Sequence, residues 1–304
     1  MLQIYENCQL CPRMCQVNRV KGQTGVCKVS SKLKVARAAL HFWEETCISG
    51  TKGSGAVFFS GCSMHCVFCQ NQEIAQGVSG KEISKERLVE IFLELQEQGA
   101  NNINLVTPGQ YVPHIIWGVE QAKRQGLNIP IVYNTSSYEK IETLKQLEGI
   151  VDVYLPDFKY WSPELAAKYS NAPDYPDVAK AAIAEMVRQQ PEVLFSYDGE
   201  QDVDLIQKGV IVRQLLLPGQ LSDAKKIVSY LHEAYGEKIY LSLMSQYTPL
   251  KHVQNYPELN RKVSRKAYDE YVDYALAIGV ENGYIQEEDV AEESFIPAFD
   301  GEGV

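Results

Sequence analysis

The sequence predicts an α/β fold in which repeated β–α units surround a parallel sheet. From Gly55 onward, apolar runs of strand length alternate with amphipathic segments of helix length. The chain has 304 residues, 45% of them hydrophobic, which is enough to bury a large core in one main domain. No internal repeat or low-complexity segment breaks this pattern.

Six strands are expected, each an apolar run bounded by turn-forming residues. They lie near residues 55–60, 102–107, 130–134, 151–156, 210–217 and 239–244.

Two helices have clear start and stop signals. The first follows Ser84, an N-cap residue, carries apolar residues at helical spacing, and ends at Gly99. The second begins at Ser222 and stops at Gly236. Both follow predicted strands, as β–α units require.

The loop after the first predicted strand contains Cys62, Cys66 and Cys69, spaced C-x3-C-x2-C, with Phe68 before the last cysteine. A [4Fe–4S] cluster normally takes four cysteine ligands, so three leave one iron open to bind a small molecule. The same spacing would suit one face of a helix, with the cysteines as small buried hydrophobes. The apolar run 54–61, with glycines near both ends, favours a strand-to-helix loop and therefore a cluster site.

This loop resembles the signature of the radical S-adenosylmethionine (SAM) enzymes, and the resemblance extends from about residue 1 to residue 286. Further segments are similar to the pyruvate formate-lyase activating enzyme-like group: CQLCPR at 8–13, CQN at 69–71, NINLVTP at 102–108 and YLPDFK at 154–159. The resemblance implies a [4Fe–4S] cluster whose open iron chelates SAM, and a one-electron donor such as flavodoxin or ferredoxin. Reductive cleavage of SAM would give a 5′-deoxyadenosyl radical that takes a hydrogen atom from a substrate.

The same resemblance implies that the six β–α units form an open, partial (β/α)6 barrel of the radical SAM type. We expect a cysteine-rich, metal-binding module over residues 1–50, the barrel core over 51–286 and an acidic tail over 287–304. In parallel barrels the active site lies at the carboxyl ends of the strands. The residues that end each predicted strand are therefore candidates for binding the cofactor.

Polar residues end three of these strands. Thr107 lies where the family has a Gly-Gly-Glu type turn that holds the SAM amino group; this chain departs from that motif, and the Thr107 hydroxyl or local carbonyls are expected to accept those hydrogen bonds. Asn134 and Ser136 follow the third strand and suit a ribose or a carboxylate. Gln246 or Tyr247 replaces the histidine that related activases carry near the ribose.

Charged residues end or interrupt two other strands. Asp157 and Lys159 are two apart on an extended segment, so they point the same way and suit both charges of an amino-acid moiety. The alternative is an ion pair between them at the barrel rim. Arg213 interrupts an apolar strand and needs a buried partner, for which the resemblance suggests a cofactor carboxylate.

The amino-terminal segment carries Cys8, Cys11, Cys15 and Cys27, spaced C-x2-C-x3-C-x11-C, and is too short to form its own core. Four soft ligands indicate zinc or a second iron–sulfur cluster, and the spacing does not choose between them. A closed four-thiolate site suits a structural staple, which favours zinc. The alternative is four reduced structural thiols, and Cys47, which stands alone, is expected to be a buried inert thiol.

Charge excludes some partners and suggests one contact. A net charge of −10 argues against nucleic acid. Without a signal-peptide pattern or an apolar run approaching 18 residues, we expect a cytoplasmic protein with no membrane segment. Residues 1–40 are basic and residues 281–304 acidic; both suit solvated surfaces, but the apolar residues Phe295, Ile296, Pro297 and Phe299 lead us to expect the tail to dock on the cysteine module.

Three functions fit these features. The first is an activase-like enzyme that abstracts hydrogen from a protein or peptide backbone, and the second is a radical enzyme that modifies a small molecule. The third is a non-catalytic iron–sulfur or zinc-binding adaptor. Asp157, Lys159 and Arg213 favour catalysis, because an adaptor has no need of charges that hold a cofactor.

Overall fold

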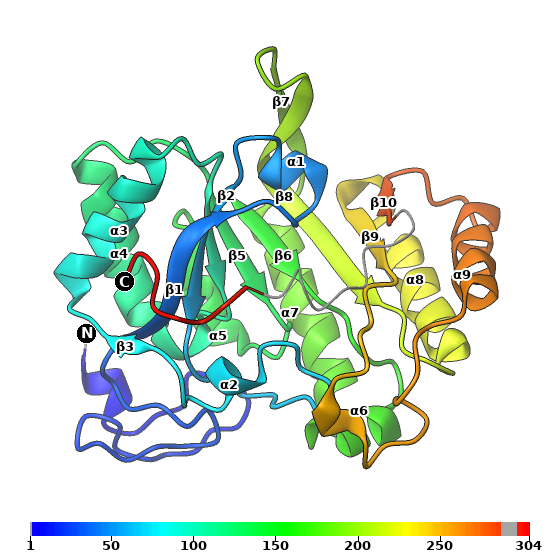
Figure 1. Ribbon diagram of the computed structural model, residues 1–304, viewed down its shortest axis with the longest axis horizontal. Helices are drawn as coiled ribbons and strands as arrows, with labels where there is room; N and C mark the ends of the chain where they lie inside the picture. Colours follow the sequence, from blue (N-terminus) through cyan, green and yellow to red (C-terminus); the bar gives the residue numbers. More distant parts are fainter. Residues whose placement is uncertain (1, 287–296) are drawn as a thin grey trace.

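The computed structural model describes residues 2–286 and 297–304. Its centre is a sheet in which six consecutive parallel strands lie in the order β2-β4-β5-β6-β8-β9 (Figure 1). Their bounds are β2 (Ser54–Phe59), β4 (Ile103–Val106), β5 (Ile131–Thr135), β6 (Val153–Pro156), β8 (Val203–Leu215) and β9 (Tyr240–Met244). All six overlap predicted strands, although β8 begins at Val203, well before the predicted start at 210. The open, partial (β/α)6 barrel is confirmed.

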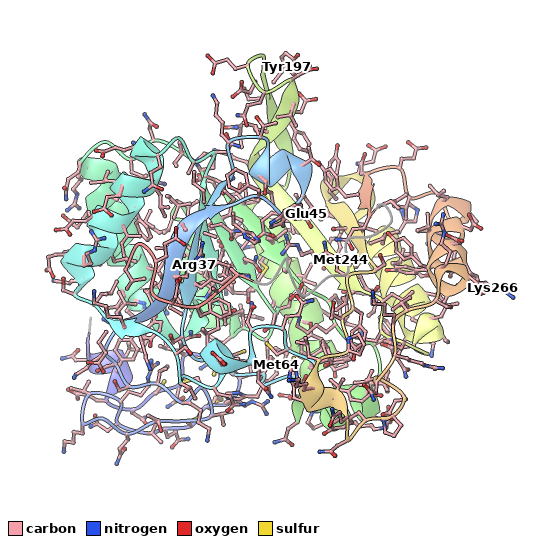
Figure 2. All side chains as sticks on the ribbon, in the orientation of Figure 1. Arg37, Glu45, Met64, Tyr197, Met244 and Lys266 are labelled. Atoms are coloured by element: carbon pink, nitrogen blue, oxygen red, sulfur yellow. The ribbon has the colours of Figure 1, made fainter. Side chains whose placement is uncertain are left out.

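Four further strands lie outside the predicted set: β1 (Lys34–His41), β3 (Lys81–Glu82), β7 (Leu194–Asp198) and β10 (Gly283–Ile285). β1 is antiparallel to β2, and β3 extends that edge. β10 adds to the opposite edge, beside β9. β7 pairs with the amino-terminal half of β8 in a hairpin that protrudes from the molecule, with Tyr197 near its tip (Figure 2). The hydrophobic pattern of the sequence does not predict β3, β7 and β10, because these strands are short and their side chains are mostly exposed.

Helices cover the outer face of the sheet. They are α3 (Lys85–Glu97), α4 (Val112–Arg124), α5 (Ile141–Leu144), α6 (Pro163–Ser170), α7 (Tyr175–Gln189), α8 (Leu221–Tyr235) and α9 (Arg265–Ala277). The Ser84 hydroxyl accepts a hydrogen bond from the Arg87 amide at 3.0 Å, which caps α3 as predicted. α8 stops before Gly236, whose φ of +51° favours glycine.

The inner face of the sheet is filled near the starts of the central strands by α1 (Thr46–Ser49). Cys47 and Ile48 of α1 pack against inner-facing residues of β5, β6 and β8, among them Val153 and Ile211. Burial raises the pKa of Cys47 to about 12, so this thiol stays protonated at neutral pH. Within residues 1–50, β1 (34–41) therefore belongs to the sheet and α1 (46–49) packs on it. The loops that carry Cys8, Cys11, Cys15 and Cys27 precede both elements.

Residues 297–304 of the tail extend the sheet along β1. The Gly301 amide donates to the Ala36 carbonyl at 3.2 Å, and the Ala38 amide donates to the Glu302 carbonyl at 2.9 Å. The Phe299 ring lies against Phe58 of β2, with ring centroids 5.5 Å apart. The tail thus covers part of an otherwise open strand edge.

The expected docking of the tail on the amino-terminal module, residues 1–50, is borne out for these residues, which contact its strand β1. The carboxylates of Asp300 and Glu302 pair with Arg37 of β1, because that strand offers both a basic side chain and free backbone groups. Phe295 and Ile296, which the prediction also used, lie outside the described residues.

Replacing the tail's aromatic anchor tests this contact. Phe299→Ala should lower the free energy of unfolding by about 1–2 kcal/mol, because the ring is half-buried against Phe58. Asp300→Asn, a change of an exposed carboxylate, is the matched control and should change it by less than about 0.5 kcal/mol. Equal urea midpoints for Phe299→Ala and the unaltered protein would show that the tail adds no stability.

Candidate active site

The cysteine loop leaves the carboxyl end of β2 at Gly61 and leads to α2 (Gln72–Ala75). Gly61 has a φ of +89°, and a Cβ atom there would lie 2.6 Å from the Cys27 carbonyl oxygen. Only glycine therefore allows the loop to pass so close to the amino-terminal segment. Met64, inside the loop, marks its place at the lower rim of the sheet in Figure 2.

The three loop thiols are free and lie close enough to influence one another. The Met64 amide donates to Cys62 Sγ at 3.4 Å, and the Ser170 hydroxyl of α6 donates to Cys66 Sγ at 3.0 Å. Burial, together with the Cys66 and Cys62 thiols, raises the pKa of Cys69 to about 12. Such thiols ionise only beside a compensating positive charge, which the iron ions of a bound cluster would supply.

A cluster and a single metal ion place different demands on the positions of these thiols. Within residues 2–286 and 297–304, no three His, Cys, Asp or Glu side chains converge as ligands of one metal ion. In a [4Fe–4S] cluster each thiolate binds a different iron, so the ligands surround the cluster rather than a point.

Lys159 and Asp157, at the end of β6, form an ion pair with Nζ and Oδ2 2.6 Å apart. Burial alone would lower the pKa of Lys159, but Asp157 and the Cys66 and Cys69 thiols raise it above its ordinary value. The two side chains thus pair with each other, the alternative considered from the sequence, and the ammonium lies beside the cysteine loop.

Arg213 lies on the inner face of β8, 8% exposed, and its partners are two carboxylates of the chain itself. Its Nε donates to Glu45 Oε1 at 2.8 Å, and its Nη2 contacts both Glu44 and Glu45. Burial would raise the pKa of Glu45, but the Arg213 charge holds it below its ordinary value. Figure 2 shows Glu45 over the central part of the sheet.

Glu44 and Glu45 are site residues that the sequence analysis missed. Two adjacent acidic residues directly before the buried helix α1 were the available signal, since buried carboxylates need a cationic partner. Glu44 also accepts from Asn104 Nδ2 at 2.9 Å, while Asn104 Oδ1 is buried without a partner in the described part of the chain. A polar patch therefore lies on the inner face between β4 and β8.

The remaining predicted residues lie on the same rim as the cysteine loop. The Thr107 amide donates to the Asn134 carbonyl at 2.9 Å, which joins the ends of β4 and β5. Gln70 of the loop donates from Nε2 to the Gln246 carbonyl at 3.2 Å. Thr107 and Ser136 line one cavity with Cys62. The fold thus brings these residues together, as the strand-end argument predicts.

The amino-terminal cysteines lie at this rim as well. Cys8, Cys11, Cys15 and Cys27 line the same cavity as Cys62. In Figure 1 the segment that carries them forms the dark blue loops below the sheet. The module and the cysteine loop are therefore neighbours.

Two arginines and a glutamine, also missed from the sequence, hold the module in place. Arg13 donates to the Ser63 carbonyl at 2.9 Å and to the Ser170 carbonyl at 3.0 Å. Arg19 donates to the Gln110 carbonyl at 2.8 Å, and the Gln110 amide nitrogen reaches the Gly61 carbonyl at 2.9 Å. These long-range bonds connect loops, for which no hydrophobic period gives a signal.

Comparisons with known proteins agree with this geometry. Residues 56–199 match the family model described as the radical SAM superfamily. The chain is 28% identical over 280 residues, 90% of its length and 75% of the relative's, to an uncharacterized protein of Methanocaldococcus jannaschii.

Among solved structures, the hydrogenase maturase HydG of Carboxydothermus hydrogenoformans has a TM-score of 0.49 at 14% identity, covering 79% of this chain and 55% of that one. Methylornithine synthase has a TM-score of 0.49 at 13% identity, covering 79% of this chain and 66% of that one. SuiB of Streptococcus suis, bound to SAM, has a TM-score of 0.48 at 13% identity over 74% of this chain and 48% of its own. The chain thus spans about half to two thirds of these proteins.

No helix in the described part of the chain is long and apolar enough to cross a membrane. The matched region begins in β2, includes the cysteine loop and extends through the ends of β4, β5 and β6. Residues 56–199 of this chain, which include the three cysteines of the loop, therefore match the radical SAM superfamily.

Proposed function

We propose that this protein is an activase-like radical SAM enzyme that abstracts a hydrogen atom from a protein or peptide backbone. One observation supports the radical chemistry. Cys62, Cys66 and Cys69 are free thiols on one loop at the carboxyl rim of a barrel whose residues 56–199 match the radical SAM superfamily. When bound there, a three-thiolate [4Fe–4S] cluster and SAM supply one-electron cleavage of the sulfonium to a 5′-deoxyadenosyl radical.

The chain's own groups prepare the loop for a negatively charged cluster. Hydrogen bonds from the Met64 amide and the Ser170 hydroxyl stabilise thiolate charge on Cys62 and Cys66. The Lys159 ammonium adds a positive charge beside Cys66 and Cys69. Aromatic rings limit water at the loop, since Phe68 packs against Tyr160 and Tyr247.

For SAM, the rim offers polar groups of the right kinds. Lys159 suits a carboxylate and Asp157 an ammonium, once their ion pair opens to admit the ligand. Thr107, Asn134, Ser136 and Gln246 offer hydrogen-bonding groups for the ammonium and the ribose. Arg213 already has two carboxylate partners, so we assign it to holding Glu44 and Glu45 on the inner face rather than to a cofactor carboxylate.

The nature of the substrate rests on the sequence resemblance to the activase-like group. A radical modifier of a small molecule is the second candidate, favoured by the polar inner-face patch, where Asn104 Oδ1 is buried without a partner among the described residues. A protein such as flavodoxin or ferredoxin is the proposed electron donor.

Cys66→Ala tests the cluster assignment. The variant should lose the [4Fe–4S] absorption of this loop and all reductive cleavage of SAM, because only two thiolates remain. Cys47→Ala, which removes a buried thiol packed on the inner face, is the matched control and should keep both. Cleavage by Cys66→Ala at the rate of the unaltered protein would refute the assignment.

Arg213→Leu tests the role given to the buried cation. The change leaves two buried carboxylates without a counter-ion and should lower the free energy of unfolding at pH 7 by about 3–5 kcal/mol. Combining it with Glu44→Gln and Glu45→Gln should restore most of that loss.

The pH dependence of Arg213→Leu has a definite sign. In the unaltered protein the pKa of Glu45 is lowered, so its stabilisation is lost as pH falls through that pKa. In the variant, burial raises the carboxyl pKa values, and acid relieves the buried charges. The stability gap, measured by urea unfolding between pH 7 and pH 4, should therefore narrow; a constant gap would show that the pair contributes no buried charge.

Deuterium transfer separates the two substrate classes. The reduced protein with SAM should move deuterium from a backbone-deuterated candidate protein into 5′-deoxyadenosine, detected by mass spectrometry. Transfer from deuterated small metabolites alone would favour the second candidate. SAM binding without cleavage under reducing conditions would instead favour the adaptor.

A further inference from the structure

The cavity lined by the four amino-terminal cysteines contains two buried polar atoms that no other part of the described chain satisfies. Arg19 is 1% exposed and its Nε has no hydrogen-bond partner. Glu139 is 7% exposed; its Oε1 accepts from the Thr135 hydroxyl at 2.7 Å, and its Oε2 has no partner. Both residues line the cavity. An anionic occupant there would complete the interactions of Arg19 Nε, a donor, whereas Glu139 Oε2 is an acceptor that such a group does not satisfy.

Charge indicates what kind of occupant this is. The acceptors of Arg19 are the carbonyls of Gln110 and Ser30 and the sulfur of Cys8 at 3.7 Å, and no described carboxylate pairs with it. A buried guanidinium needs an anion. The acids that line this cavity are the four amino-terminal cysteines, Cys62 and Glu139, whose Oε2 has no described partner. Metal-bound thiolates would supply that negative charge, whereas four protonated thiols would leave Arg19 with neutral partners, the carbonyls and the rings of Tyr5 and Tyr111.

The geometry of the thiols separates a cluster from a zinc ion. Zinc would draw four sulfurs to about 2.3 Å from one point. No three of the described metal-binding side chains converge in that way, yet all four amino-terminal cysteines surround one cavity. The Cys62, Cys66 and Cys69 triad has the same property, and its family relationship implies a cluster.

We propose that Cys8, Cys11, Cys15 and Cys27 hold a second iron–sulfur cluster, which Arg19 faces and which lies against the Cys62 loop. This inference goes beyond the proposed function and replaces the zinc staple favoured by the sequence. The contact with the loop rests on three observations: Cys62 lines the same cavity, Arg13 binds the Ser63 carbonyl, and Gly61 leaves room for the Cys27 carbonyl.

Metal content tests the proposal directly. A variant with Cys62, Cys66 and Cys69 all replaced by alanine, purified without oxygen and reconstituted with iron and sulfide, should keep about four iron atoms and no zinc per chain. Alanine at Cys8, Cys11, Cys15 and Cys27 should leave the same number at the other loop, and Cys47→Ala should leave both sites full. One zinc in place of the iron in the first variant, or neither metal, overturns the proposal.

The unaltered protein provides a measurement that does not depend on how the variants fold. It should bind about eight iron atoms per chain. Its fully reduced electron paramagnetic resonance spectrum should show spin coupling that is absent from the sum of the two single-site variants, because the clusters are neighbours. About four iron atoms per chain, with an uncoupled spectrum, contradicts the proposal.

Arg19→Met, made in the variant that lacks the Cys62 loop cysteines, tests the facing charge. Reduction adds a negative charge to the cluster, so loss of the guanidinium should shift its midpoint potential to a more negative value. Arg265→Met, at a distant exposed site on α9, is the matched control. An unchanged midpoint potential would show that the Arg19 guanidinium does not face the cluster. Two clusters without SAM cleavage would defeat the proposed function and leave this inference standing.

Discussion

The buried chain of hydrogen bonds from Arg19 through Gln110 to Gly61 is the interaction on which the site depends. Arg19 binds the Gln110 carbonyl, and the Gln110 side chain binds the carbonyls at the ends of β2 and β4. These bonds fix the amino-terminal loops to the rim where the cysteine loop begins. Gly61 completes the arrangement, because any side chain there would collide with the Cys27 carbonyl.

The parallel sheet explains why distant residues meet at one rim. Thr107, Asn134 and Asp157 each end a different strand, and the backbone bonds of neighbouring strand ends hold them together. Successive side chains of a strand point to opposite faces of the sheet. Arg213 therefore points to the inner face, while its neighbour Val212 packs in the outer core. The inner face thereby acquires its charged residues without disturbing the packed helices outside.

The hydrophobic pattern predicted the six central strands because each is a buried apolar run bounded by turns, and the cysteine spacing predicted the loop. What the sequence could not predict depends on long-range pairing. From the sequence alone, Glu44 and Glu45 look like surface acids. Their partner, Arg213, lies 169 residues after Glu44 and 168 residues after Glu45. Glu139 and Gln110 are ordinary polar loop residues whose burial follows only from the packed rim. The tail's preference for β1 depends on a strand edge that no local pattern reveals.

The central claim is that the Cys62, Cys66 and Cys69 loop holds a cluster that cleaves SAM by one-electron chemistry. The most direct test is to incubate the reconstituted protein with SAM and a strong one-electron reductant without oxygen, and to measure 5′-deoxyadenosine and methionine. We expect both products in equal amounts, and only when the reductant is present. A protein with its full iron content that forms neither product would contradict it.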